Sequence, residues 1–205
     1  MIGFYNYSVF MTYIGLIASV VGISFVISGA FTPAFICLLI SGFCDMFDGR
    51  IARIKKNRSD LEKSFGIQID SLCDVICFGV FPAIIGFCLG GTYPLRIISS
   101  CMIVLCAVIR LGYFNVMEIK RQSESEGKRD FYTGLPVTSV ALVLPLAYIA
   151  KDRLDDYFPL FFQCLLILIS LLFLMKIKVH KPGIIGAVIM SVLGIIIGLD
   201  FLFRS

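Results

Sequence analysis

The sequence predicts an all-α integral membrane protein, a polytopic bundle of six to eight transmembrane helices with seven favoured. Of its 205 residues, 59% are hydrophobic and only 16% are charged, and the mean hydropathy is +0.95. A soluble domain is about half apolar and a quarter charged, so this chain has too little polar surface to cover itself. Because a spanning helix needs about 20 apolar residues, the length allows these spans and no separate soluble domain. We expect a single membrane domain over residues 1–205.

Seven apolar stretches, separated by polar or glycine-containing turns, define the expected spans. Pro33 falls in the first turn of the second stretch, where its missing N–H group is harmless. Gly90, Gly91 and Pro94 mark the turn between the third and fourth stretches. The expected spans cover residues 9–28, 32–50, 65–90, 95–117, 132–150, 159–175 and 183–203.

Small side chains within these stretches suit close packing between helices. The eight cysteines all lie in apolar stretches and form no CxxC pair, so we expect buried thiols and no zinc site. Glycine lets two helix backbones approach each other in a membrane. The positions expected to do so are Gly15, Gly22, Gly86, Gly186 and Gly194.

Basic residues set the expected orientation. Residues 50–63, 120–129 and 176–181 hold six, four and three lysines or arginines, against four on the opposite side of the bundle. Because lysine and arginine are retained on the cytoplasmic side, these three segments should face the cytoplasm of a cell membrane. The net charge of +4 suits contact with anionic lipid headgroups. Membrane lipids, and no nucleic acid, are therefore the expected surroundings.

Four aspartates lie at the cytoplasmic ends of the second and third spans. Asp45 and Asp48 are spaced i,i+3 and Asp70 and Asp74 are spaced i,i+4, so each pair shares one helix face. The two spans are consecutive and antiparallel, so all four carboxylates can meet at one depth. Unpaired carboxylates in these apolar surroundings would repel each other and take up protons. A divalent cation resolves this, and oxygen ligands favour Mg²⁺ or Mn²⁺. The alternative is that some of them are helix caps or proton-relay groups.

Three small residues and one arginine lie near the aspartates. Gly49, Ala52 and Gly66 would let a bulky ligand approach the backbone closely. Arg53 suits a phosphate group because the guanidinium fork matches phosphate oxygen atoms. The alternative for Arg53 is an anchor at the membrane interface.

The order Asp-x-x-Asp-Gly-x-x-Ala-Arg from Asp45 to Arg53, followed by Gly-x-x-x-Asp-x-x-x-Asp from Gly66 to Asp74, resembles the signature of the CDP-alcohol phosphatidyltransferase family. The gap of 12 residues between the two halves is longer than is common in the family. It falls in a polar loop, where insertions are tolerated. The resemblance covers a motif-bearing core of about residues 32–140 and implies a homodimer.

The resemblance also implies a role for each residue of the motif. Asp74 would accept the proton of an incoming alcohol. A two-metal site would be held by Asp45, Asp48, Asp70 and Asp74. The CDP-linked lipid would be bound by Asp48, Gly49, Ala52, Arg53, Gly66 and Asp70.

The run DSLCDVICFGVFPA, residues 70–83, resembles the branch of that family that uses L-serine as the acceptor. Residues 110–115 and 132–136 resemble segments that accompany the motif in that branch. The resemblance implies transfer of the phosphatidyl group from CDP-diacylglycerol to the hydroxyl of L-serine, which releases CMP and forms phosphatidylserine.

Four residues are candidates for binding the acceptor. Arg110 lies within the fourth expected span and could pair with the serine carboxylate, with a motif aspartate or with a lipid phosphate. Asn115 could hydrogen-bond the acceptor or cap the span. Tyr132 and Thr133 fall at the cytoplasmic interface, where tyrosine is also an ordinary membrane-belt residue.

Two other kinds of function compete with this one. A sister enzyme could use glycerol 3-phosphate, inositol phosphate or choline, although a phosphorylated acceptor calls for more basic residues than Arg110 supplies. A cation transporter would spread its carboxylates through several spans at mid-depth. Here they cluster at one edge, apart from Asp200. A structural scaffold, a weaker alternative, would give the aspartates no role.

Overall fold

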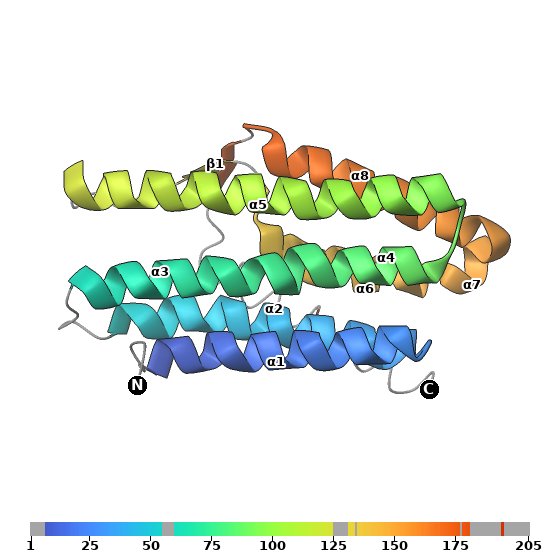
Figure 1. Cartoon of the computed structure of the whole chain (residues 1–205), viewed down its shortest axis with the longest axis horizontal. Coiled ribbons are helices and arrows are strands. Elements are labelled where there is room, and N and C mark those ends of the chain that lie inside the picture. The colour runs from blue at the N-terminus through green and yellow to red at the C-terminus, as the bar shows by residue number, and fades with distance from the viewer. Residues whose placement is uncertain are drawn as a thin grey trace.

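The computed structural model describes residues 7–54, 60–124, 131–133, 135–176, 178–180 and 194. Over this part of the chain the protein is helical apart from one short two-stranded ladder, and its long helices lie side by side along one axis (Figure 1). Four stretches are long and apolar enough to cross a membrane: Val9–Ile27, Leu61–Leu89, Tyr93–Ile119 and Lys151–Leu174. The chain is therefore an integral membrane protein, as its composition predicts.

Two shorter apolar helices, Phe31–Phe47 and Val137–Ile149, correspond to the expected second and fifth spans. The prediction that the fifth span begins at residue 132 is wrong. Pro136 is extended, with ψ 139°, and helical structure starts only after it, because a proline inside a helix removes a hydrogen bond and crowds the preceding turn. The expected seventh span, 183–203, lies outside the described residues except for Gly194.

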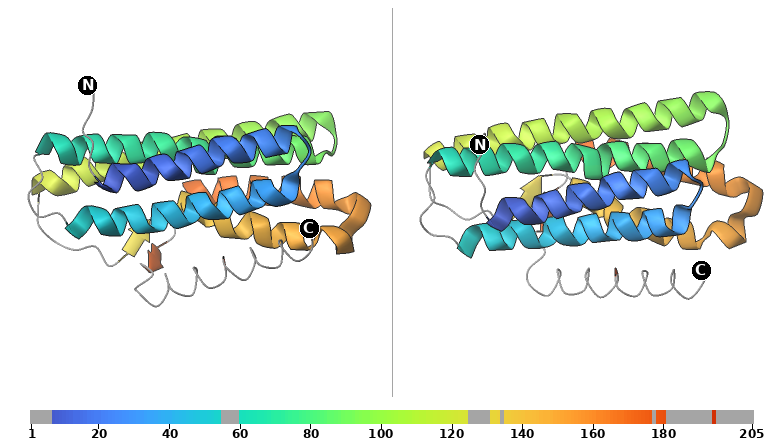
Figure 2. Two further views of the ribbon diagram at one scale, coloured as in Figure 1. Left: turned by 90° about the horizontal axis from the view of Figure 1, so that it is seen from below. Right: turned by 60° about the horizontal axis from the view of Figure 1, so that its bottom comes forward.

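The first two helices form an antiparallel hairpin (Figures 1 and 2). α1 (Tyr7–Ile27) is terminated by Gly29, which has a φ of +80°. The N–H of Ala30 then bonds to the carbonyl of Phe25 at 2.9 Å. α2 (Phe31–Ile54) then returns along α1. Ser41 of α2 donates to the carbonyl of Gly15 at 2.7 Å, a polar contact between the two helices inside the apolar bundle.

The third membrane stretch is one continuous rod with a widened turn in it. α3 (Asp60–Asp74) passes into a π-helical turn, Val75–Val80, and then into α4 (Phe81–Leu89). Pro82 has no N–H and its ring would crowd the carbonyl four residues earlier, so an α-helix cannot continue regularly through it. The π turn immediately before Pro82 accommodates this, and the N–H of Phe81 bonds to the carbonyl of Ile76, five residues earlier.

The second half of the chain folds against this rod. α5 (Tyr93–Glu124) is followed by β1 (Phe131–Thr133), a 3-10 turn (Val137–Ser139), α6 (Val140–Ile149) and α7 (Lys151–Leu154). A further 3-10 turn (Asp155–Tyr157) leads to α8 (Phe158–Leu174), which packs along α5, and to β2 (Lys178–His180). β1 and β2 pair antiparallel with Tyr132 opposite Val179. The sequence did not predict this ladder.

Buried polar side chains join the helices at the end of the bundle away from the ladder. Gln163 of α8 is fully buried, and its Nε2 donates to the carbonyls of Gly86 at 2.7 Å and Gly90 at 3.1 Å. Its Oε1 accepts a hydrogen bond from Ser99 of α5. This network supplies partners to carbonyl groups at the end of α4, where the helix itself offers none.

The glycines expected to allow close helix contact do so where the structure describes them. A Cβ on Gly15 would lie 3.2 Å from the Cβ of Cys44, and one on Gly22 would overlap the ring of Phe81. A Cβ on Gly86 would overlap Leu166, and one on Gly194 would lie 3.1 Å from the ring of Phe43. Gly186 lies outside the described residues. The expectation of buried thiols is wrong for three of the eight cysteines, because Cys88, Cys101 and Cys164 are exposed.

Candidate metal and substrate site

Three of the four motif aspartates meet in one cluster. Asp45 comes from α2, and Asp70 and Asp74 come from α3. Each offers a carboxylate oxygen, and these oxygen atoms all lie within 4.8 Å of one another. Asp74 is buried, with 8% of its surface exposed, whereas the other two are half-buried. The spacing in the sequence predicts that these carboxylates can meet, and for these three the carboxylate oxygen atoms do lie close together. Asp48 lies on α2, but its side chain is outside the part that the structure describes.

The local structure explains why the aspartates face the same space. Asp70 and Asp74 are one helical turn apart, so their carboxylates project from one face of α3. Asp74 is the last residue before the π turn, so the widened turn begins immediately beyond the cluster. α1 contacts both α2 and α3, and it closes the cluster from a third side.

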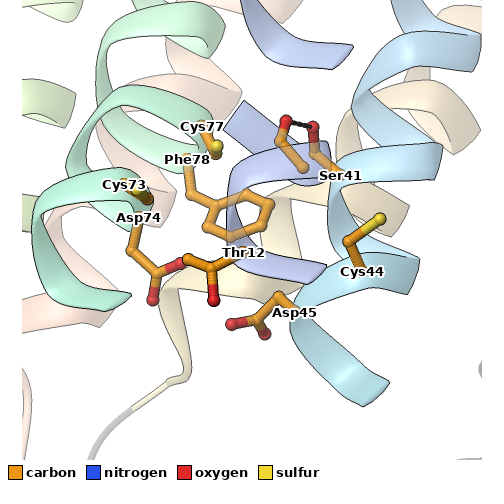
Figure 3. A pocket seen from close by; sticks show the side chains of 9 residues that line it. Thr12, Ser41, Cys44, Asp45, Cys73, Asp74, Cys77 and Phe78 are labelled. Carbon is orange, nitrogen blue, oxygen red and sulfur yellow. Dashed lines mark hydrogen bonds between the residues drawn. The ribbon is translucent and has the colours of Figure 1, made fainter. Parts of the chain in front are cut away.

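The cluster opens into a small cavity between α1, α2 and α3 (Figure 3). Its empty volume is about 190 Å³, including the part open to solvent, which is too little for a nucleotide or a lipid. Two of its lining residues come from α1, three from α2 and four from α3 and the π turn. They are Thr12, Gly15, Ser41, Cys44, Asp45, Cys73, Asp74, Cys77 and Phe78.

Thr12 is a site residue that the sequence analysis missed. It is buried, with 9% of its surface exposed, and its hydroxyl lies between the carboxylates of Asp45 and Asp74 and points to the same side (Figure 3). It precedes the motif by more than thirty positions and lies in an apolar helix, so no spacing connects it with the aspartates. The available signal was a polar residue inside an expected membrane span.

The cluster fits a hard divalent cation. Three carboxylates from two helices, confined within 4.8 Å in an apolar bundle, have strong mutual repulsion that a cation would relieve. Octahedral Mg²⁺ has oxygen ligands at about 2.1 Å, so neighbouring ligand atoms are about 3 Å apart and opposite ones about 4 Å apart. The upper limit of 4.8 Å between the aspartate oxygen atoms is close to the distance between opposite ligands of Mg²⁺. Asp45, Asp70 and Asp74 could therefore hold Mg²⁺ or Mn²⁺.

The rest of the expected lipid-binding motif lies on the same two helices. The backbone of α2 carries Gly49, Ala52 and Arg53, whose side-chain surroundings are outside the part the structure describes. Gly66 is one turn before Asp70 on α3. Among the described residues, no heavy atom lies within 4 Å of a Cβ built on Gly66. That space is compatible with a ligand close to the backbone.

Asn115 of α5 is connected directly to the motif helix. Ser71, which lies between the two aspartates of α3 in sequence, donates a hydrogen bond of 2.8 Å to Oδ1 of Asn115. Both side chains are buried, at 8% and 9% exposure. Because the amide oxygen is engaged, the amide N–H groups are the part of Asn115 that can serve a ligand.

Arg110 is directed differently from Asn115. An offset of five residues on α5 rotates the side-chain direction by about 140°. Nη1 of Arg110 donates to the carbonyl of Phe173 at 3.2 Å, in the last turn of α8. A cation there favours the end of a helix, where carbonyl groups lack partners. The sequence analysis expected a serine carboxylate, a motif aspartate or a lipid phosphate as the partner, and did not expect this backbone carbonyl.

Tyr132 and Thr133 lie in β1, in the segment that leads back to the site. α2 and α6 run antiparallel (Figure 1), and Ala141 fits against Gly42, so closely that a Cβ on the glycine would overlap it. Three residues further along both helices, the 3-10 turn Val137–Ser139 therefore reaches the level of Asp45, and it packs on α2, α5 and the π turn. The side chains of Tyr132 and Thr133 themselves are outside the described part.

Comparison with known proteins agrees with this geometry. The family model described as CDP-alcohol phosphatidyltransferase matches residues 5–198. Over 125 residues the chain is 40% identical to a CDP-diacylglycerol–serine O-phosphatidyltransferase of Saccharomyces cerevisiae, covering 59% of this chain and 44% of that protein.

Two further relatives come from an archaeon and a bacterium. The chain is 33% identical over 162 residues to an archaetidylserine synthase of Methanothermobacter thermautotrophicus, covering 78% of this chain and 64% of that protein. It is 29% identical over 133 residues to a CDP-diacylglycerol–serine O-phosphatidyltransferase of Mycobacterium leprae, covering 64% and 43%. The chain thus spans less than two thirds of the length of each of these three relatives.

Proposed function

The chain belongs to the CDP-alcohol phosphatidyltransferase family, and we propose that it transfers the phosphatidyl group of CDP-diacylglycerol to the hydroxyl group of L-serine. The observation that carries the proposal is the meeting of Asp45, Asp70 and Asp74, from both halves of the family motif, within 4.8 Å of one another. The names of all three relatives refer to serine, while the lipid named differs between them. Serine is therefore the better supported half of the substrate pair.

The chemistry proceeds by displacement at phosphorus. The hydroxyl oxygen of L-serine forms a bond to the phosphorus that carries diacylglycerol, and the bond from that phosphorus to the bridging oxygen breaks. CMP leaves with the electron pair, and Asp74 takes the proton of the hydroxyl. A bound Mg²⁺ or Mn²⁺ pair would neutralise charge that develops on the transferred group and on the leaving oxygen.

The aspartates have two tasks in this proposal. Asp45, Asp48 and Asp70 bind the metal ions, and Asp74 binds metal and also receives the proton. Gly49, Ala52, Arg53 and Gly66, together with Asp48 and Asp70, hold the cytidine and phosphate groups of the lipid substrate. The open space beside Gly66 supports this assignment.

The acceptor lies between α3, α5 and the segment before α6. Asn115 presents its amide N–H groups to the serine carboxylate, and Ser71 fixes the orientation of that amide. Tyr132 and Thr133 lie in the segment that returns to the level of Asp45. Arg110 is directed toward the end of α8, where it bonds to the carbonyl of Phe173, so its contribution to acceptor binding is the positive charge that it brings to α5.

The remaining parts of the proposal concern the setting of the enzyme. We propose that the protein crosses the cell membrane seven times and that the aspartates face the cytoplasm. The excess of basic residues in segments 50–63, 120–129 and 176–181 supports this orientation. The active unit is a homodimer.

The experiment is CMP release by purified protein given CDP-diacylglycerol and Mg²⁺ or Mn²⁺. L-serine, glycerol 3-phosphate, inositol, inositol phosphate and choline are offered in parallel. Release that requires both serine and metal is the expected result. Release with another alcohol would keep the aspartate mechanism and refute serine as the acceptor. If folded protein releases no CMP and proteoliposomes show metal flux, the protein is a transporter and the proposed enzyme activity is refuted.

A further inference from the structure

We propose that Thr12 of α1 is an oxygen ligand of the metal site, either to the divalent cation itself or through a bound water, and that the site is therefore built from three helices. The inference rests on the proposed function, since it concerns the same divalent cation. It extends the site to a helix outside the motif, which lies entirely on α2 and α3.

Thr12 lies beside two of the clustered aspartates. Thr12, Asp45 and Asp74 line one cavity, and the threonine hydroxyl lies between the two carboxylates on their open side (Figure 3). The side chain is buried at 9% exposure, on a helix whose opposite face is apolar and exposed at Phe10 and Ile14. The helix thus presents its hydroxyl toward the aspartates, and its apolar side chains to the outside.

The chemistry of the ligands gives a second reason for the proposal. Mg²⁺ and Mn²⁺ take six oxygen ligands, and carboxylates alone would add negative charge with every further position filled. A neutral hydroxyl adds a ligand atom without adding charge, as the Ser or Thr hydroxyl does for Mg²⁺ in phosphate-binding loops. A threonine hydroxyl has one donor and two acceptor lone pairs, so it can keep a protein partner while an oxygen lone pair binds the ion.

The packing of α1 gives a third reason. Gly15 lies one turn from Thr12, and a Cβ there would lie 3.2 Å from the Cβ of Cys44, which is next to Asp45 in sequence. One turn further, Ser19 and Ser41 of α2 are joined by a hydrogen bond of 2.7 Å. Two close contacts therefore fix α1 against α2 along the wall of the cavity, so that Thr12 is held at the level of the carboxylates.

The test compares Thr12→Val, which removes the hydroxyl with little change in shape, with Thr12→Ser, which keeps it. Saturable Mn²⁺ binding to the full-length protein in detergent is measured by the loss of the free Mn²⁺ resonance signal, without lipid substrate. We expect Thr12→Val to weaken Mn²⁺ binding about tenfold or more, the range for residues that support a metal site. Thr12→Ser should bind as the original chain does.

Two controls separate this inference from the function on which it rests. Ser24→Ala removes an exposed hydroxyl of α1 that donates to the carbonyl of Val21 within the same helix, and should not change Mn²⁺ binding. Asp45→Asn should abolish saturable binding. If Asp45→Asn does so and Thr12→Val binds with an unchanged Kd, the metal site stands and the role of Thr12 is refuted. If the original chain binds no Mn²⁺, both fail. Thermal unfolding without metal confirms that Thr12→Val is folded.

Discussion

Ser71→Ala should weaken the binding of L-serine while leaving the binding of CDP-diacylglycerol nearly unchanged. The Ser71 hydroxyl donates to the amide oxygen of Asn115 at 2.8 Å, and both groups are buried. Without that donor the amide of Asn115 is free to turn and to present its oxygen where its N–H groups are needed. A serine carboxylate, which only accepts hydrogen bonds, would then meet another acceptor.

The size of the effect follows from the single hydrogen bond that is lost. A hydrogen bond between neutral groups contributes about 0.5–1.5 kcal/mol. Since about 1.4 kcal/mol corresponds to a tenfold change in an equilibrium constant, the KM for L-serine should rise about two- to twelvefold. Ser71→Thr keeps a hydroxyl and should restore most of the affinity. In an Asn115→Ala background, Ser71→Ala should have little further effect.

The assay is CMP release, with L-serine and CDP-diacylglycerol titrated separately. Ser100→Ala is a matched control, because Ser100 of α5, like Ser71 of α3, donates a hydrogen bond to a neighbouring helix, here to the carbonyl of Ala83 at 3.0 Å. It should change neither KM. An equal rise of both constants in Ser71→Ala would show that the pair only packs α3 on α5. Equal effects of Ser71→Ala with and without Asn115 would show that Ser71 does not act through Asn115.

Three further substitutions test other parts of the structure. Asp74→Asn should lower kcat about 10²- to 10⁴-fold, as expected for loss of a proton acceptor, with little change in thermal unfolding; an active variant would remove Asp74 from that role. Arg110→Ala should raise the KM for serine more than that for CDP-diacylglycerol, whereas an equal rise with a lower Tm would show a structural role, as in the bond to the carbonyl of Phe173. Gln163→Leu removes two hydrogen bonds to carbonyl groups at the end of α4 and should lower the free energy of unfolding by about 1–3 kcal/mol. Cys164→Leu, at the exposed neighbouring position, should have a much smaller effect on unfolding in detergent.

Local patterns in the sequence predicted most of the described helices, with the start of the fifth expected span as the exception. The first expected span, residues 9–28, corresponds to the helix Tyr7–Ile27, and the turn expected at Gly90 and Gly91 separates α4 from α5. Hydropathy and glycine act over a few neighbouring residues, so a single sequence shows them. The cluster of aspartates was predictable for the same reason, because i,i+3 and i,i+4 spacings fix a helix face.

The features that the sequence did not reveal depend on contacts between distant segments. The pairing of Phe131–Thr133 with Lys178–His180 joins segments more than forty residues apart, and no local pattern marks it. The bond from Arg110 to Phe173 crosses between α5 and α8 in the same way. Thr12 comes to lie beside the aspartates through the packing of α1, which no spacing in the sequence shows.

In the proposed function, the reaction and the choice of acceptor belong to different elements. The carboxylates lie on α2 and α3, which carry the whole family motif, whereas the candidate acceptor residues lie on α5 and in the segment that leads to α6. The hydrogen bond from Ser71 to Asn115 joins α3 to α5, and Ser71 is next to Asp70 and three residues before Asp74. A change on α5 can therefore alter which alcohol is held beside the aspartates without moving the carboxylates themselves. On this reasoning, substitutions at Asn115 should change the ratio of activities with different alcohols, while substitutions at Asp45 should reduce activity with all of them equally.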